Sequence, residues 1–444
     1  MDYLIVGSLI AEVLILSRVD RRVFGTWFTP FTLLSVPYGA VAVLAFLFAP
    51  SLDFAPLYTP SLCIWIVGLF IFWVVGFVLG WGIFGLDCQQ IDKPSILHPA
   101  VPKSNTEARS IKWANWAAWA MAPILLLGFL STLRTSGGWE EIGGPEYRDN
   151  YSRGLHAHLI VVGLAVIILL IGGNGKGKKL QLLSIAILMV FVFASQVKGT
   201  FFQPIIGGLA YRSLRGAAGG LTIKRILTVV SCSFLVFLLI YMTGFLIVDP
   251  LVAKDWDLYS VLSRHYLFYL FAGPLSLGEA VRTHVTNVGG EWYTLFSPFI
   301  NISRVVMGST ALVPTGSALE KGMDVDYQRP LMLGGANVYT FFGTPYLYLG
   351  LFGSMLYVVA VSLFCYGLLI HAKRSGNEWV LVAYCFIGAQ LFFGFFELYF
   401  SYLTSLELIA YSFVLSFVTK WQETKTRHVS KDLDFHVEAR SSGA

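Results

Sequence analysis

The sequence carries little charge. Only 13% of its 444 residues are Asp, Glu, Lys or Arg, whereas soluble domains carry about 25%. Hydrophobic residues make up 56% of the chain, and the mean hydropathy is +0.68. A water-soluble fold could not hide this much apolar surface, because surface area falls too slowly as a chain grows. The composition therefore predicts a protein whose solvent is largely lipid.

Several signals of common functions are missing as well. The chain has no Gly-x4-Gly-Lys-Ser/Thr segment and no clear Gly-x-Gly-x-x-Gly segment after a strand, so nucleotide binding is not predicted. The five cysteines show no metal-ligand spacing and imply no disulfide framework. The net charge of +5 is too small to suggest a nucleic-acid partner. We expect no metal and no other cofactor.

What the chain does have is long apolar runs. Crossing the hydrocarbon core takes roughly 20 predominantly apolar residues in a helix. The sequence predicts an all-α polytopic membrane protein with about eleven transmembrane helices near 2–17, 26–49, 61–84, 113–133, 155–172, 181–196, 199–211, 226–248, 343–370, 380–398 and 403–419. The 199–211 run is short and rich in Gly and Pro, so a re-entrant segment or half of a broken helix is the alternative there.

Clusters of Lys and Arg predict the orientation, because they concentrate on the cytoplasmic side of membrane proteins. With eleven spans, all the clusters fall on one face, which puts the N-terminus outside and the C-terminus inside. The clusters are Arg18/Arg21/Arg22, Lys93/Lys103/Arg109/Lys112, Lys176/Lys178/Lys179, Arg212/Arg215/Lys224/Arg225, Lys373/Arg374 and the tail from Lys420.

This layout divides the chain into four parts. Residues 1–248 form helices 1–8 with a short external loop at 134–154, 249–342 form a large external loop, 343–419 form helices 9–11, and 420–444 form a cytoplasmic tail. Loops longer than about 12–15 residues are usually functional or disordered. The large loop is rich in aromatic residues, and Tyr259–Phe271 within it has the character of an amphipathic helix on the membrane surface. Chemistry is expected in this loop.

The ionisable residues of the outer side suit a phosphate-containing substrate. The arginine fork matches phosphate oxygens and stays charged at any working pH, and fixed cations stabilise the charge that builds on a departing pyrophosphate. The candidate cations are Arg264, Arg282, Arg304 and Arg329, with Lys198 at the outer end of a span. The alternative for each arginine is a solvated or salt-bridged surface residue.

A sugar hydroxyl that attacks such a donor needs a base. His265 and Glu291 are the candidates in the large loop. Glu397 and Glu407 lie near the ends of the last two apolar runs. Ionisable groups inside a membrane are functional candidates by default, but these two are close enough to the interface to be simply solvated.

Three segments resemble a known family. Gly334-Gly335-Ala336-Asn337-Val338-Tyr339-Thr340-Phe341-Phe342, followed by Pro345-Tyr346, is similar to the Asn-Val-Tyr-Thr segment of Wzy-type oligosaccharide repeat unit polymerases, the O-antigen, enterobacterial common antigen and capsule polymerases. The stretch from Ser263 to Pro274 resembles an aromatic segment of the same family. Lys198-Gly199-Thr200 keeps part of a third motif, and Phe201 replaces its arginine. The Arg-x10-Gly motifs of some members are missing.

The resemblance implies a fold and an activity. The fold would be all-helical and similar in outline to the GT-C membrane glycosyltransferases. The enzyme would sit in the bacterial inner membrane with a periplasmic N-terminus. It would transfer a growing chain from undecaprenyl pyrophosphate onto a lipid-linked repeat unit at the periplasmic face, without a metal. Its expected partners are a flippase and a chain-length regulator.

The resemblance also suggests roles for residues. Arg264, Arg282, Arg304, Arg329 and Lys198 would bind the pyrophosphates, and His265 or Glu291 would be the base. Asn337 and Tyr339 would position sugar or shape the junction between loop and span, although an Asn here is also suited to cap the next helix. An O-antigen ligase, with the same donor and layout, is one alternative function. A transporter or flippase of lipid-linked sugars is the other, and the lack of internal repeats weighs against it.

Overall fold

The computed structural model describes residues 1–85, 105–142, 144–173, 177–196, 198–215, 258–285, 292–308, 322–327 and 338–419, with the single positions 235, 238, 239, 313 and 336. Within these ranges the regular elements are helices. Two isolated β-bridges also occur, between Phe54 and Asp326 and between Met323 and Ala336. The prediction of an all-helical protein is confirmed for the described residues.

The helices follow one another along the chain with short connections between most of them. Their bounds are α1 Asp2–Phe24, α2 Pro30–Phe48, α3 Leu62–Phe77, α4 Asn105–Thr135, α5 Pro145–Tyr151, α6 Gly154–Gly172, α7 Lys178–Ala194, α8 Lys198–Leu214, α11 Leu258–Arg282, α12 Ser297–Val306, α13 Gly343–Ser375 and α14 Glu378–Phe392. One more apolar helix, Leu403–Thr419, closes the described chain.

Six helical segments are long and apolar enough to cross a membrane. They are Pro30–Phe48, Thr59–Ile83, Glu107–Thr135, Gly154–Gly172, Gly343–Ser375 and Glu378–Phe395. The protein is therefore a helical membrane protein. Helices also cover the predicted runs at 2–17, 181–196, 199–211 and 403–419, although these do not meet the same criteria. The run at 226–248 lies almost entirely outside the described residues.

The doubtful 199–211 run is a continuous helix. α8 extends from Lys198 to Leu214 with Pro204 inside it. It packs against α6 and α14. Glycines allow that packing, because a Cβ at Gly208 would lie 2.5 Å from a methyl carbon of Ile171. Neighbouring helices commonly make proline tolerable within such helices.

α14 is the centre of the bundle. It contacts α2, α6, α8 and α13, and its side chains from Glu378 to Leu391 are buried. Between Trp379 and Ala389 its residues are largely apolar on all sides, as expected for a helix surrounded by others. Asn377 caps its start, since the Asn377 side chain accepts hydrogen bonds from the Trp379 and Val380 amides.

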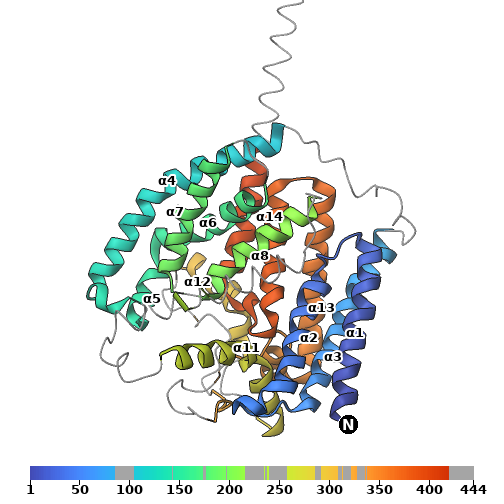
Figure 1. The fold of residues 1–444 in the computed structure, drawn as a ribbon. Coiled ribbons are helices and arrows are strands. Elements are labelled where there is room, and N and C mark those ends of the chain that lie inside the picture. Colours follow the sequence, from blue (N-terminus) through green and yellow to red (C-terminus); the bar gives the residue numbers. More distant parts are fainter. Residues whose placement is uncertain are drawn as a thin grey trace, which may run out of the picture.

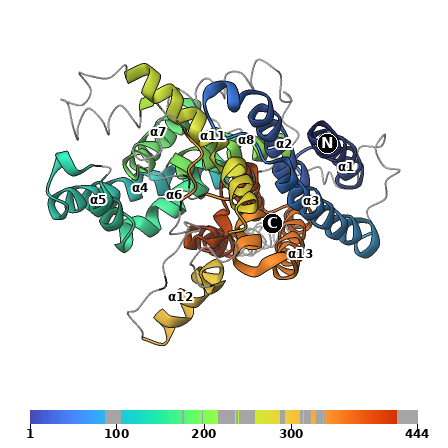
Figure 2. The same cartoon turned by 90° about the horizontal axis from the view of Figure 1, so that it is seen from below.

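The basic helix ends gather at one end of the bundle. Figure 1 shows the N-terminus of α1 at the bottom and the ends of α1, α8 and α13 at the top, where α4 and α7 begin. These ends carry Arg21 and Arg22, Arg212, and Lys373 and Arg374. We call this the basic end, and the other the α11 end, because α11 lies across it in the view from below (Figure 2).

α11 differs from the surface helix expected for Tyr259–Phe271. It is longer and packs into the protein against α2. Phe268, Phe271 and Leu275 are buried, and the Phe271 ring meets Phe54 edge-on at 5.8 Å between centroids. The apolar face of this helix is therefore covered by protein rather than by lipid.

Candidate functional site

Three segments that are far apart in the chain meet at the α11 end. They are α11, residues 338–342, and the break in the helices at residues 393–402, between α14 and Leu403–Thr419. The Phe341 amide donates to the Gly394 carbonyl at 2.7 Å. A Cβ on Gly273 of α11 would lie 2.2 Å from the Phe395 carbonyl oxygen. The two backbones are therefore in direct contact, which only glycine permits.

The break holds two short 3₁₀ turns, Phe393–Phe395 and Tyr399–Ser401. Its Gly394 faces Leu34 of α2, whose side chain would lie 2.6 Å from an added Cβ. The Gly394 carbonyl accepts a hydrogen bond from the Phe341 amide, and the Phe396 carbonyl accepts one from the Thr340 amide. Irregular backbone at membrane depth persists only where protein or water satisfies its polar groups, and here the 338–342 segment does so.

A carboxylate lies on this break. Glu397 is only 9% exposed, and the Tyr402 hydroxyl donates a hydrogen bond to its Oε1. Tyr269 of α11 stacks on Phe396, with 5.4 Å between ring centroids. Burial raises the pKa of the Tyr269 phenol to about 12, with Arg148 of α5 opposing the rise and Glu397 adding to it. Tyr269 is therefore a neutral hydroxyl at physiological pH.

His265 joins the same group from one turn earlier in α11. Its ring meets Tyr269 edge-on at 5.1 Å between centroids, as the four-residue spacing on a helix allows. We call His265, Tyr269, Glu397 and Tyr402 the Glu397 cluster. It combines a largely buried carboxylate, an imidazole and two phenols. Such a set can accept, donate and orient protons.

The 338–342 segment is held in a strained shape beside the cluster. Thr340 has φ 70°, which is uncommon for a β-branched residue. Its Oγ1 accepts from the Trp65 indole N–H at 3.0 Å and from the Gly343 amide at 3.2 Å. Phe342 packs on Gly68, where a Cβ would lie 2.6 Å from its ring. Backbone strain of this kind concentrates at functional sites.

Arg264 is a predicted arginine with several contacts. Its Nε donates to both Asp326 oxygens, at 3.0 and 3.1 Å, and its Nη1 donates to the Leu52 carbonyl at 2.9 Å. Its guanidinium lies 4.7 Å from the centre of the Phe54 ring. Arg264 therefore matches the alternative given for each outer arginine, that of a salt-bridged residue. Arg264 ties α11 to the 52–54 loop and to Asp326.

The other predicted residues are spread more widely. Arg282 ends α11, is 57% exposed and pairs with Glu279 one turn earlier. Arg304 lies half-buried on α12, and Tyr339 is fully buried in the 338–342 segment. Glu291, Arg329 and Asn337 lie outside the described residues, as does the side chain of Lys198. Among the predicted residues described here, His265 lies in the Glu397 cluster, and Tyr339 belongs to a segment beside it.

Glu397 is a residue for which the sequence left two interpretations open. Near the end of an apolar run it was either a functional candidate or a solvated side chain, and in the structure the helix break turns it into the protein, where it is 9% exposed. A signal was present in the chain, because Glu397 is followed by Tyr399 and Tyr402 in an aromatic stretch. Aromatic neighbours with hydroxyl groups can satisfy a carboxylate without water.

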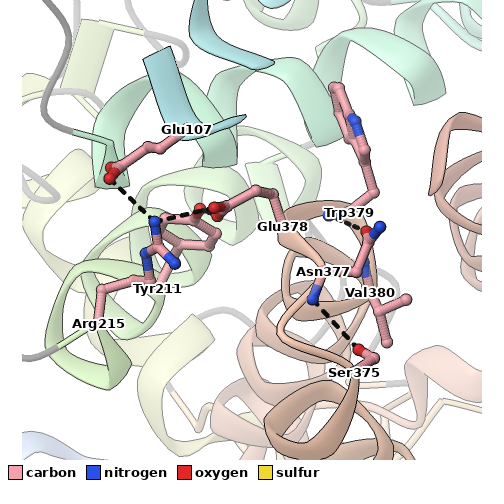
Figure 3. Close-up of polar contacts among 8 residues, drawn as sticks. All are labelled: Glu107, Tyr211, Arg215, Ser375, Asn377, Glu378, Trp379 and Val380. Carbon is pink, nitrogen blue, oxygen red and sulfur yellow. Dashed lines mark hydrogen bonds and ion pairs between the residues drawn. The ribbon is translucent and has the colours of Figure 1, made fainter. Parts of the chain in front are cut away.

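A second buried polar cluster lies at the basic end. Figure 3 shows Arg215 between Glu107 of α4 and Glu378 of α14, at 2.9 and 2.8 Å. The Tyr211 hydroxyl of α8 donates to the other oxygen of Glu378. Gly172 leaves room for Tyr211, whose ring would lie 2.2 Å from an added Cβ. This cluster joins three helices and lies at the opposite end of the bundle from Glu397.

The comparison with protein families gives one match. A family of unknown function, DUF6337, matches residues 53–425. This chain belongs to the DUF6337 family. The matched region contains α11, the 338–342 segment, the break and both polar clusters. No curated protein and no solved structure matches the chain.

Proposed function

We propose that this DUF6337 protein is a glycosyltransferase that polymerises lipid-linked oligosaccharide repeat units at the outer face of a bacterial inner membrane. One observation carries the proposal. The 263–274 and 338–342 segments, which resemble segments of Wzy-type polymerases, both lie against the break that carries Glu397. Two segments that resemble segments of the same polymerase family thus lie against the same buried carboxylate.

The reaction suits the groups of the Glu397 cluster. The acceptor hydroxyl oxygen forms a bond to the anomeric carbon of the growing chain, and the bond from that carbon to the pyrophosphate oxygen breaks. The electron pair leaves with undecaprenyl pyrophosphate, and the hydroxyl proton passes to a base. We assign the base to Glu397, which Tyr402 orients, with His265 as the alternative.

The cationic side chains predicted from the sequence also have roles in this proposal. Arg282, Arg304, Arg329 and Lys198 are proposed to stabilise the two pyrophosphates. For Arg264 the contacts with Asp326 favour a positioning role, because they hold α11 in place against the loop at residues 52–54. The proposal also includes eleven spans, a GT-C-like outline, a periplasmic N-terminus, and a flippase and a chain-length regulator as partners.

The orientation in the proposal rests on charge. The basic helix ends lie together at the end opposite α11 (Figure 1). Because Lys and Arg concentrate on the cytoplasmic side, the α11 end would face the periplasm, where flipped lipid-linked units are found. The Glu397 cluster would then be on the side where polymerisation takes place.

A gel of surface polysaccharide tests the proposal. The source strain without the gene is complemented with the wild-type protein, with Glu397→Gln, or with Asp149→Asn as a control at an exposed pair. A ladder with the wild type and the control, and single-repeat products with Glu397→Gln at equal protein level, would support it. Bare core with polymer retained on undecaprenyl pyrophosphate would identify a ligase instead. Repeat units left on the cytoplasmic face would identify a transporter.

A further inference from the structure

α12 has its polar and apolar faces in an unusual arrangement. Ser297, Asn301 and Arg304 follow the spacing of one helix face, and this face is turned toward the protein. Phe299, Ile302 and Val306 share the opposite face and are exposed. A helix on a water-soluble surface buries its apolar face and exposes its polar one. α12 does the reverse.

The inward face is fixed by specific bonds. The Asn301 amide donates to the Val313 carbonyl and its oxygen accepts from the Val313 amide, both at 2.8 Å. Ser297, at the start of the helix, donates to the Ser401 carbonyl at 3.3 Å. The start of α12 is therefore attached to the same break that carries Glu397. The polar residues are held inside because the protein satisfies them.

The start of α12 lies beside a helix that is long and apolar enough to cross a membrane. Phe296, just before α12, packs on Tyr357 of α13 with 6.0 Å between ring centroids. α13 is a candidate span, and Leu351, Phe352 and Leu356 are exposed on it. Figure 2 shows α12 extending sideways from the bundle. A helix that leaves the bundle sideways, next to a lipid-facing helix, meets the bilayer rather than open water.

We propose that the apolar face of α12, formed by Phe299, Ile302 and Val306, docks into the acyl chains of the surrounding bilayer. The helix lies along the membrane surface, as apolar faces of interfacial helices do. Trp292, exposed in the turn before α12, suits the headgroup level, where tryptophans concentrate. The helix links the membrane to the break through the bond between Ser297 and Ser401.

Photocrosslinking in lipid nanodiscs tests the docking directly. The full chain carries the photoreactive amino acid p-benzoylphenylalanine at Phe299, at Phe352 as a lipid-facing reference, or at Tyr327 as an exposed reference at the α11 end. Each replaces an exposed aromatic ring, so folding is little disturbed. Mass spectrometry then counts lipid adducts and protein adducts after illumination.

We expect Phe299 to give lipid adducts at a yield close to that of Phe352 and several-fold above that of Tyr327. A yield at Phe299 no higher than at Tyr327 would overturn the proposal. Adducts between two protein chains at Phe299 would overturn it as well, since the face would then belong to an interface between copies. The readout needs no activity, so the docking and the proposed polymerase function can fail independently.

Discussion

Removing Arg215 should destabilise the protein strongly. Its guanidinium bridges Glu107 and Glu378 at 2.9 and 2.8 Å, and its side chain is only 10% exposed. Arg215→Ala would leave two carboxylates close together without a cation. Breaking a buried ion pair by removing one partner costs about 3–5 kcal/mol. The stability of the contacts among α4, α8 and α14 should fall by that amount.

The matched control is another arginine pair. Arg153 and Asp149 are 2.7 Å apart, but both side chains are about 70% exposed (71% and 68%). An exposed pair contributes about 0–1 kcal/mol, so Arg153→Ala should change little. The two variants remove the same kind of side chain and differ mainly in burial. Any difference between them therefore measures the cost of an uncompensated buried charge.

Thermal unfolding in detergent, followed by tryptophan fluorescence, is a suitable assay because the chain has 12 tryptophans. Arg215→Ala should lower the Tm by about 3–5 °C, because the Tm of a 444-residue chain shifts by about 1 °C per kcal/mol, and Arg153→Ala by about 1 °C or less. Adding Glu378→Gln to Arg215→Ala should recover part of the loss, since it removes one of the stranded charges. Equal Tm values for Arg215→Ala and the wild type would refute the reasoning.

Three further changes test the candidate site. Glu397→Gln keeps the size of the side chain but loses the charge. Under the proposed function, the rate of polymerisation from purified lipid-linked units should fall about 10²–10⁴-fold, and an unchanged rate would remove this carboxylate from the chemistry. Thr340→Val leaves two buried N–H groups, those of the Trp65 indole and the Gly343 amide, without an acceptor. The free energy of unfolding, followed by thermal unfolding, should fall by about 1–3 kcal/mol. The control Thr344→Val should lower the free energy of unfolding by less, because the Thr340 carbonyl keeps the hydrogen bond from the Thr344 amide. Equal losses of stability in the two variants would contradict this view. Gly273→Ala places a methyl group 2.2 Å from the Phe395 carbonyl oxygen and should lower the free energy of unfolding by about 1–3 kcal/mol. A normal Tm would show that α11 can move away from the break.

Much of the fold could be predicted from the sequence. The six candidate spans match predicted apolar runs, and α8 is helical where the run at 199–211 was in doubt. The physical reason is local. In lipid each backbone polar group must be satisfied within the segment or by a close neighbour, so a long apolar run has few choices other than a helix.

The site depended on long-range packing. Arg264 is 62 residues from Asp326 in the chain, and no local pattern pairs them. The predicted His265 does lie in the Glu397 cluster, while for Glu397 itself the sequence left both a functional and a solvated side chain open. Whether a polar residue near a helix end meets water or protein depends on how the chain breaks and what covers the break.

The sequence by itself determined that the chain is helical and membrane-embedded, because composition and run length respond to the solvent alone. The tertiary structure decided which faces meet protein. α11 has the apolar residues of a surface helix but is covered by α2 and the break, whereas α12 turns its apolar residues outward. The hydrophobic effect is non-directional, so an apolar face shows that something must cover it, and only the packing shows what does.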